Sequence, residues 1–325
     1  MRATLGLAQV LALGLGVVLG VARPVGAQPA DPAWAPVWAY MAQSVCTDAQ
    51  DRVVAGATPL QPGCERVRTL RVGEALPYHK RDWPGVADRP RFPDGYQQSD
   101  SVPVMTARGP AVLQTFDFGD DGRAFGKLDL GDGGQLVVFT PESAAVGVTE
   151  DGGAGLQLFI GPDCTPVNGW VVVNRSFLAQ PAGETVAHLT REQNHCPAQM
   201  NEAYTHWWVQ PVSFRYRVAG GAPGTPAGMP NGAKSAVEGR AVWTTLVSEH
   251  FDAGAPERSR AMERMHFTTL LGHTRWEAWR NLALPGAAND GQPAVMAEAL
   301  AKTERCGPAL PMRAGWVMVD CREWT

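Results

Sequence analysis

The chain has 325 residues, and 28 Lys and Arg against 32 Asp and Glu give it a formal net charge of −4. This balance excludes the broad basic surface with which proteins bind DNA or RNA, so no nucleic-acid partner is expected. A hydrophobic content of 45% against 18% charged residues supplies enough apolar surface for a core and excludes a disordered chain.

The amino terminus is typical of a signal peptide. Arg2 precedes an apolar and glycine-containing run from Val10 to Ala22, and small residues end at Ala27. The run is too short to span a membrane, so we expect cleavage after residue 27 and a secreted or periplasmic protein. The mature chain contains no later stretch that predicts a transmembrane segment, and an uncleaved amino-terminal anchor is the alternative.

Residues 28–110 predict a helix, a strand and an extended wrapping segment. Apolar positions repeat at helical spacing over Asp31–Val45, and alternation over Arg66–Val72 predicts a strand. Leu76–Pro110 contains six prolines, which break regular elements. This segment either lids a groove or covers a sheet edge.

Residues 111–325 predict an all-β domain. Short β-type runs are separated by Gly-rich turns, and only Pro293–Glu304 near the end is typical of a helix. The expected strands are Val112–Phe118, Ala124–Leu130, Gln135–Thr140, Ala145–Thr149, Gly155–Ile160, Trp170–Val173, Thr185–Leu189, Tyr204–Val218, Ala241–Phe251, Glu263–Leu270 and Thr274–Trp279. The fold expected is an antiparallel, jelly-roll-like β-sandwich with short flanking helices.

The cysteines agree with export. An even number in an exported chain indicates disulfides, and six cysteines allow fifteen pairings. We favour the pairs that close short loops: Cys46–Cys64, Cys164–Cys196 and Cys306–Cys321. Their spacing fits no metal site, so none is predicted.

Tryptophan is abundant, with 11 residues, and several alternate along expected strands. Trp208 and Gln210 share a strand face with Tyr204 and His206, and Trp279 shares one with Arg275 and Glu277. Aromatic rings beside amide and charged groups are typical of sugar-binding surfaces, so Trp208, Gln210 and Trp279 are predicted ligand contacts. The alternative is that these rings all belong to the core.

Catalytic residues are predicted only as a set with suitable chemistry. A polysaccharide lyase needs a base and a group that neutralises a uronate. The candidates for such roles are His206, Arg215, Tyr216, His250, Arg275 and Glu277. A glycoside hydrolase needs two facing carboxylates, for which Glu249, Asp252, Glu263 and Glu277 are candidates.

No cofactor is predicted. The acidic turn that holds Asp117, Asp120 and Asp121 has the oxygen ligands that Ca²⁺ prefers, but it lacks EF-hand spacing. A polar hairpin is the ordinary interpretation, and Ca²⁺ is the alternative.

One stretch resembles secreted bacterial β-jelly-roll proteins of lectin-like character, which are mostly uncharacterised. The resemblance covers Met262–Phe267, Gly272 and Arg275–Trp279, with weaker echoes at Tyr78–Trp83 and Gln114–Asp117. Met265 and His266 stand where the pattern has aromatic residues. The resemblance implies the fold and no catalytic residue.

Three hypotheses follow. The first is an exported β-sandwich that binds extracellular or cell-envelope carbohydrate through an aromatic and polar sheet face. The second is a polysaccharide lyase or glycoside hydrolase on the same face. The third is a structural or interaction module of the cell envelope. The sequence predicts neither the oligomeric state nor the identity of a ligand.

Overall fold

The structure is a computed structural model. It describes residues 28–55, 57–59, 64–81, 98–106, 109–116, 135–150, 155–157, 170–188, 202–218, 237–285, 292–302 and 313–324. The expected signal peptide, the strand expected at 124–130, the acidic turn at Asp117 and the pair Cys164–Cys196 lie outside these ranges.

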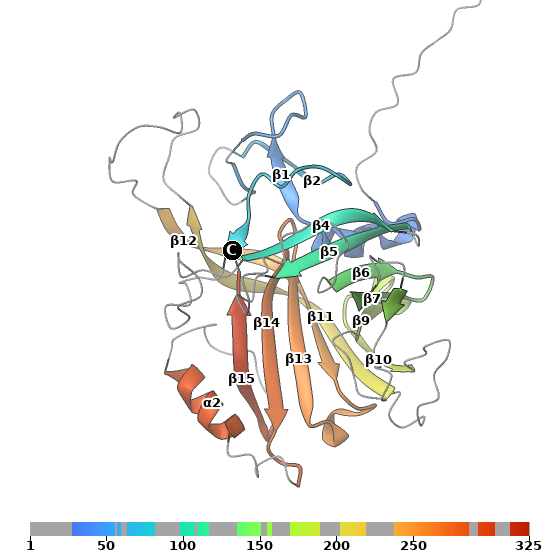
Figure 1. The fold of residues 1–325 in the computed structure, drawn as a ribbon, viewed down its shortest axis with the longest axis vertical. Coiled ribbons are helices and arrows are strands. Elements are labelled where there is room, and N and C mark those ends of the chain that lie inside the picture. Colours follow the sequence, from blue (N-terminus) through green and yellow to red (C-terminus); the bar gives the residue numbers. More distant parts are fainter. Residues whose placement is uncertain are drawn as a thin grey trace, which may run out of the picture.

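The larger of the two main sheets has seven antiparallel strands (Figure 1). Its strands are β3 (Lys80–Arg81), β4 (Gln98–Thr106), β5 (Gly109–Phe116), β6 (Gln135–Phe139), β7 (Ser143–Glu150), β8 (Gly155–Gln157) and β9 (Trp170–Asn174). They follow each other in chain order from β3 to β8, and β9 pairs with β7.

The other main sheet has six antiparallel strands in strict chain order. Its strands are β10 (Gly183–His188), β11 (Glu202–Val218), β12 (Val237–Phe251), β13 (Ala261–Thr268), β14 (Gly272–Asn281) and β15 (Trp316–Glu323). Within the described ranges the six-stranded sheet is therefore a meander, and the seven-stranded sheet is one from β3 to β8, whereas the strands of a jelly roll follow Greek-key connections.

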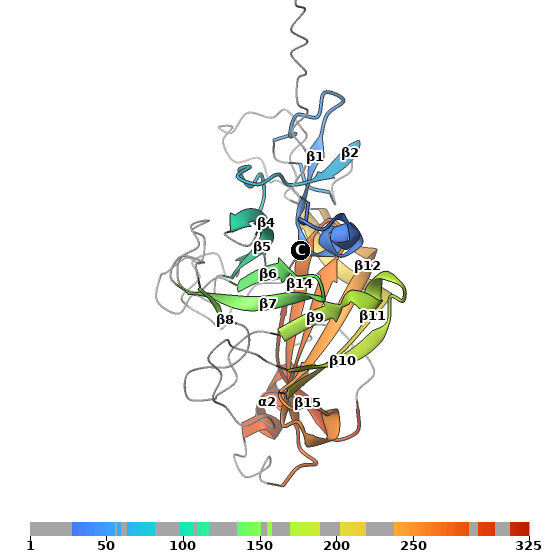
Figure 2. The ribbon, with the colours of Figure 1, turned by 90° about the vertical axis from the view of Figure 1, so that its right-hand side faces the viewer.

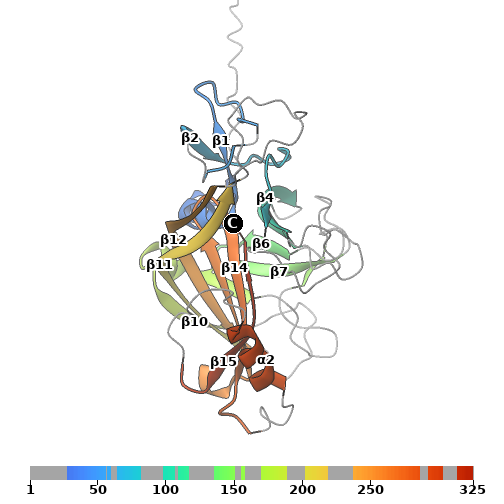
Figure 3. The same ribbon diagram turned by 90° about the vertical axis from the view of Figure 1, so that its left-hand side faces the viewer.

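The two sheets form the expected β-sandwich. In both side views β4, β6 and β7 lie on one side of β14, and β11 and β12 lie on the other (Figures 2 and 3). One hydrophobic cluster joins residues of both sheets, and it includes Val137 and Val172 from the first and Leu246 and Phe267 from the second.

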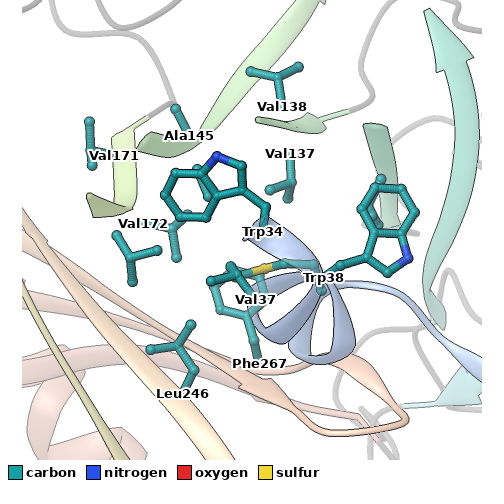
Figure 4. Packing of buried hydrophobic residues seen from close by; sticks show 14 of the residues in the cluster. Trp34, Val37, Trp38, Val137, Val138, Ala145, Val171, Val172, Leu246 and Phe267 are labelled. Atoms are coloured by element: carbon teal, nitrogen blue, oxygen red, sulfur yellow. The ribbon is translucent and has the colours of Figure 1, made fainter. Parts of the chain in front are cut away.

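A short helix completes this core. The helix α1 (Ala35–Met41) follows the 3-10 turn η1 (Pro32–Trp34), in which Asp31 accepts a hydrogen bond from the Ala33 amide. Trp34 and Trp38 lie four residues apart, one helical turn. The Trp34 ring projects among the valines of β6 and β9, and the Trp38 ring projects to the other side of the helix (Figure 4), where it contacts Phe139. Both rings are buried, so the helix packs between the two sheets.

The helix ends four residues earlier than the sequence predicts. Residues Ser44–Thr47 form β1, which pairs with β2 (Arg66–Thr69). All four side chains of β1 are buried, and Val45 and Thr47 are β-branched, which favours the extended chain. A disulfide between Cys46 and Cys64 ties this pair of strands together, as predicted.

The expected wrapping segment Leu76–Pro110 contains regular strands, which corrects the sequence prediction. It holds β3 and β4, and the expected boundary at residue 110 falls inside β5. Pro103 pairs with Val112 at a point beyond the end of β3, where one edge of β4 has no described neighbour. A sheet tolerates proline at such an edge because no ladder hydrogen bond is lost there.

The carboxy-terminal part adds a helix and a strand. The helix α2 (Gln292–Ala301) agrees with the expected Pro293–Glu304 and lies beside β15 (Figure 1). The strand β15 was missing from the sequence prediction, and it completes the six-stranded sheet. Its Cys321 is disulfide-bonded to a cysteine outside the described ranges.

Two further 3-10 turns are η3 (Arg175–Leu178) and η5 (Pro256–Arg258). None of the helices within the described ranges has the length and apolar character that crossing a bilayer requires.

Candidate functional site

The six-stranded sheet carries a polar row on the face turned away from the main core. Trp207 and Leu246 point into that core, so their chain neighbours point to the opposite face. The strand register brings these neighbours side by side across five strands. We call this surface the polar face, and its members are Tyr204, His206, Trp208, Gln210, Trp243, Thr245, Glu249, Phe251, Met262, Arg264, His266, Arg275, Glu277, Trp279 and Glu323.

Arg264 is the centre of the polar face. Its Nε and Nη2 donate to Oε1 of Glu249 at 3.0 and 2.6 Å, and its Nη1 donates to Oε2 of Glu277 at 3.0 Å. Its guanidinium lies 4.9 Å from the ring centroid of Trp279 and 5.9 Å from that of Trp208. The planar Arg264 guanidinium contacts two carboxylates and two aromatic rings. It is therefore held rigidly, and it fixes the positions of the residues around it.

Glu277 has partners on two strands, β13 and its own strand β14. Besides Arg264, it accepts the indole N–H of Trp279 at 2.9 Å and lies 2.6 Å from Nη2 of Arg275. The His266 imidazole lies 3.5 Å from its other oxygen. Glu277 is fully buried, and a buried carboxylate requires partners of this kind.

Both central carboxylates are held in the ionised form. Burial alone would raise the pKa of Glu277, but the His266, Arg275 and Arg264 contacts hold it well below its usual value. Burial likewise opposes ionisation of Glu249, and the contacts with His206 and Arg264 lower its pKa.

The polar face opens along β11. His206 keeps 34% of its side chain exposed, and its Nδ1 lies 3.2 Å from Oε2 of Glu249. Trp208 is half-buried, and its ring lies 4.9 Å from the His206 ring. Its position between His206 and Arg264 holds the indole in one orientation at the margin of the buried network.

Two donors on the same face of β11 and β12 lack partners. Among the described residues, Nε2 of Gln210 and Nε1 of Trp243 make no hydrogen bond, although both atoms are buried. Thr245 of β12 pairs with Gln210 of β11. Because every second residue of a strand points to the same face, Trp243 lies on the same face of β12 as Thr245. Unsatisfied buried donors on one face call for acceptors on that face.

The structure brings together His206, Arg275 and Glu277 of the six predicted catalytic residues, and it separates the other three. His250 points to the opposite face, where it faces Thr205 and Glu263 in the ladder. Arg215 and Tyr216 lie in the part of β11 that pairs only with β12. They are nine and ten residues from His206, which is roughly 30 Å along a strand.

The three predicted ligand contacts also differ. Trp208 and Gln210 lie together at the open margin of the polar face, half-buried. Trp279 lies on the same face but is fully buried, in a second hydrophobic cluster with Phe251, Met262 and Trp316. Its ring therefore belongs to the core, as do most of the tryptophans with described burial: Trp34, Trp38, Trp207, Trp279, Trp316 and Trp324.

The carboxylates considered for glycoside hydrolysis do not form a facing acid and nucleophile. Glu249 and Glu277 are both bound to Arg264, and neither has a raised pKa. Burial raises the pKa of Glu263, but Glu263 lies on the other face and accepts the indole N–H of Trp276. Burial also raises the pKa of Asp252, which accepts two backbone N–H groups.

Sequence reasoning missed Arg264 and Trp243 as parts of this site. Alternation places Arg264 on one face of its strand, but only the register shows that this face is the one that carries Glu249 and Glu277. A prediction of the strand order β11-β12-β13-β14 would have brought these residues together.

Within the described ranges, no group of three or more His, Cys, Asp or Glu side chains is arranged to hold a metal ion. The comparisons with protein families, curated proteins and solved structures found no match to this chain.

Proposed function

We propose that this protein is exported and binds an uncharged glycan at the open margin of the polar face. The observation that carries the proposal is the half-buried Trp208, which is held between His206 and Arg264. The same face of β11 and β12 also carries two unsatisfied donors, on Gln210 and Trp243. The disulfide Cys46–Cys64 supports an oxidising compartment.

This arrangement has the chemistry of sugar recognition. An indole ring offers a flat apolar surface to the apolar side of a pyranose. The Gln210 amide and the Trp243 N–H donate to hydroxyl oxygens, and the buried network fixes the geometry before any ligand arrives. Such preorganisation reduces the entropic cost of binding.

Binding is better supported than cleavage. A lyase for uronates needs a cation for the sugar carboxylate. Arg264 is paired with Glu249 and Glu277, and Arg275 is paired with Glu277 and Glu323. Neither guanidinium is left over for a substrate carboxylate, so an uncharged glycan fits the site better than a polyuronate.

The proposal predicts that Trp208→Leu weakens glycan binding about tenfold or more, because loss of the ring removes the stacking surface. Titration calorimetry with xylo-, cello-, manno- and galacto-oligosaccharides measures this, and oligouronates serve as the charged members of the panel.

Trp276→Leu is the matched control, since Trp276 is also half-buried but lies on the opposite face of the sheet. We expect it to leave the affinity within about twofold. Equal loss of affinity in both variants, or no binding of any oligosaccharide by the wild-type chain, would contradict the proposal.

A further inference from the structure

The two carboxylate oxygens of Glu249 have different partners. Oε1 accepts both hydrogen bonds from Arg264, at 3.0 and 2.6 Å. Oε2 remains for His206, whose Nδ1 lies 3.2 Å away. Glu249 is 5% exposed, and it is ionised because His206 and Arg264 overcome the effect of burial on its pKa.

An ionised carboxylate oxygen only accepts hydrogen bonds, so the ring nitrogen that faces it must carry the proton. The other nitrogen of a neutral imidazole is then an acceptor. His206 is the member of this chain of contacts with an exposed edge, and it lies beside the Trp208 ring.

We infer that Glu249 fixes His206 as the Nδ1-protonated tautomer, and that His206 Nε2 is the acceptor that selects a ligand hydroxyl at the glycan site. The inference rests on the proposed function for its ligand, but the tautomer is a property of the unliganded protein. Arg264 is a positioning residue in this scheme, because it holds the carboxylate that orients the imidazole.

The tautomer has consequences for selectivity. A hydroxyl group donates to Nε2, whereas the same position blocked as a methyl ether has no proton to donate and leaves the acceptor unpaired. A site built around a hydrogen bond rejects an analogue that lacks the donor more strongly than an apolar pocket does.

Two-dimensional ¹H–¹⁵N correlation of the histidine rings tests the tautomer directly. Spectra are recorded near pH 9, above the ordinary titration range of imidazole, and His206 is assigned by the signal lost in His206→Gln. We expect the Nδ1–H pattern in the wild-type protein. An Nε2–H pattern for His206 would overturn the inference without touching the proposed function.

Glu249→Gln sharpens this test. Its amide oxygen retains the Arg264 hydrogen bonds, and its NH₂ group then faces Nδ1 as a donor, so the His206 tautomer should change to Nε2–H. His79 is the internal control, because its Nδ1 lies 2.9 Å from Oδ2 of Asp100 and that pair is unaltered. A His206 tautomer that stays the same in a folded Glu249→Gln protein would contradict the role of Glu249.

The binding arm uses the oligosaccharide that the wild-type chain binds best and its per-O-methylated form. We expect the wild type to prefer the parent sugar by about tenfold or more, and Glu249→Gln to reduce that preference to about threefold or less. Binding of the parent sugar with no discrimination by the wild type would overturn the selectivity while leaving the proposed function intact. Absence of all sugar binding would contradict the proposed function and leave the tautomer result standing.

Discussion

At the scale of single residues, the polar face depends on charges that are buried in pairs. Arg264 has 2% of its side chain exposed, and its two carboxylate partners have 6% and 0%. Removal of one member of such a set leaves the others as uncompensated buried charges, which costs far more than the net stability of the intact pair.

Arg264→Met should therefore lower the free energy of unfolding by about 3–5 kcal/mol, as measured by urea denaturation. Arg52→Met is the control, because Arg52 pairs with Asp48 at the surface and 75% of its side chain is exposed. We expect the control to change stability by less than about 1 kcal/mol. Equal effects of the two substitutions would show that the network is not the buried unit described above.

The alternation of residues in the sequence predicted much of the polar face. Positions 204–210 and 275–279 alternate cleanly, so the shared faces of His206 with Trp208 and of Arg275 with Glu277 are correct. The burial of Trp279 was not predictable, because it depends on Phe251, Met262 and Trp316 from three other strands.

At the scale of elements, the turn between β13 and β14 connects the six-stranded sheet to the rest of the core. Gly272 has a φ of +68°, and a Cβ there would lie 2.4 Å from the Ser101 Cβ and 2.8 Å from the Met41 carbonyl oxygen. The turn is thus packed against both β4 and α1, and only glycine fits.

Gly272→Ala should destabilise the protein by on the order of 3 kcal/mol or more, since it combines backbone strain with a clash. Gly73→Ala separates the two causes, because Gly73 has a φ of +75° but no heavy atom within 4 Å of the added Cβ. We expect it to cost about 1 kcal/mol in the same thermal or urea unfolding experiment. A similar loss for both would contradict the close contact at Gly272.

The elements that sequence reasoning located best were those with local signals. Alternation on both sides of Gly272 predicts the hairpin β13–β14, and the composition of its segment predicts α2. The strands β4 and β15 were missed for opposite reasons. Pro103 in β4 and Pro110 in the neighbouring β5 obscured β4, although Pro103 pairs with Val112 and Pro110 pairs with Met105. The strand β15 lacks clean alternation because a bulge shifts its register against β14.

At the scale of the whole molecule, a buried ammonium group joins the two sheets. Nζ of Lys80 in β3 donates to the carbonyl oxygens of Leu271 and His273 at 2.5 and 2.8 Å, and to Oγ of Ser101 at 3.3 Å. Burial lowers the pKa of Lys80 to about 7, opposed by the nearby Asp100. Nothing in the sequence marks this lysine as buried.

The lowered pKa of Lys80 makes stability depend on pH. Above pH 7 the folded protein loses this proton, whereas the unfolded chain keeps it up to its ordinary pKa of 10.5. The unfolded state then binds more protons, so stability should rise between pH 7 and 9 by up to about 1.4 kcal/mol per pH unit. Urea denaturation at several pH values measures this, and Lys80→Met should flatten the slope. An identical slope in that variant would exclude Lys80 as its source.

The proposed glycan site occupies one surface of one sheet. Its most direct test is the ¹⁹F spectrum of protein labelled with 5-fluorotryptophan, recorded with and without the best-binding uncharged oligosaccharide. The Trp208 resonance, assigned by its loss in Trp208→Leu, should shift on addition of the sugar, while those of the core residues Trp34 and Trp207 stay in place. Binding that leaves the Trp208 resonance unmoved would place the ligand elsewhere and contradict the proposed site at Trp208.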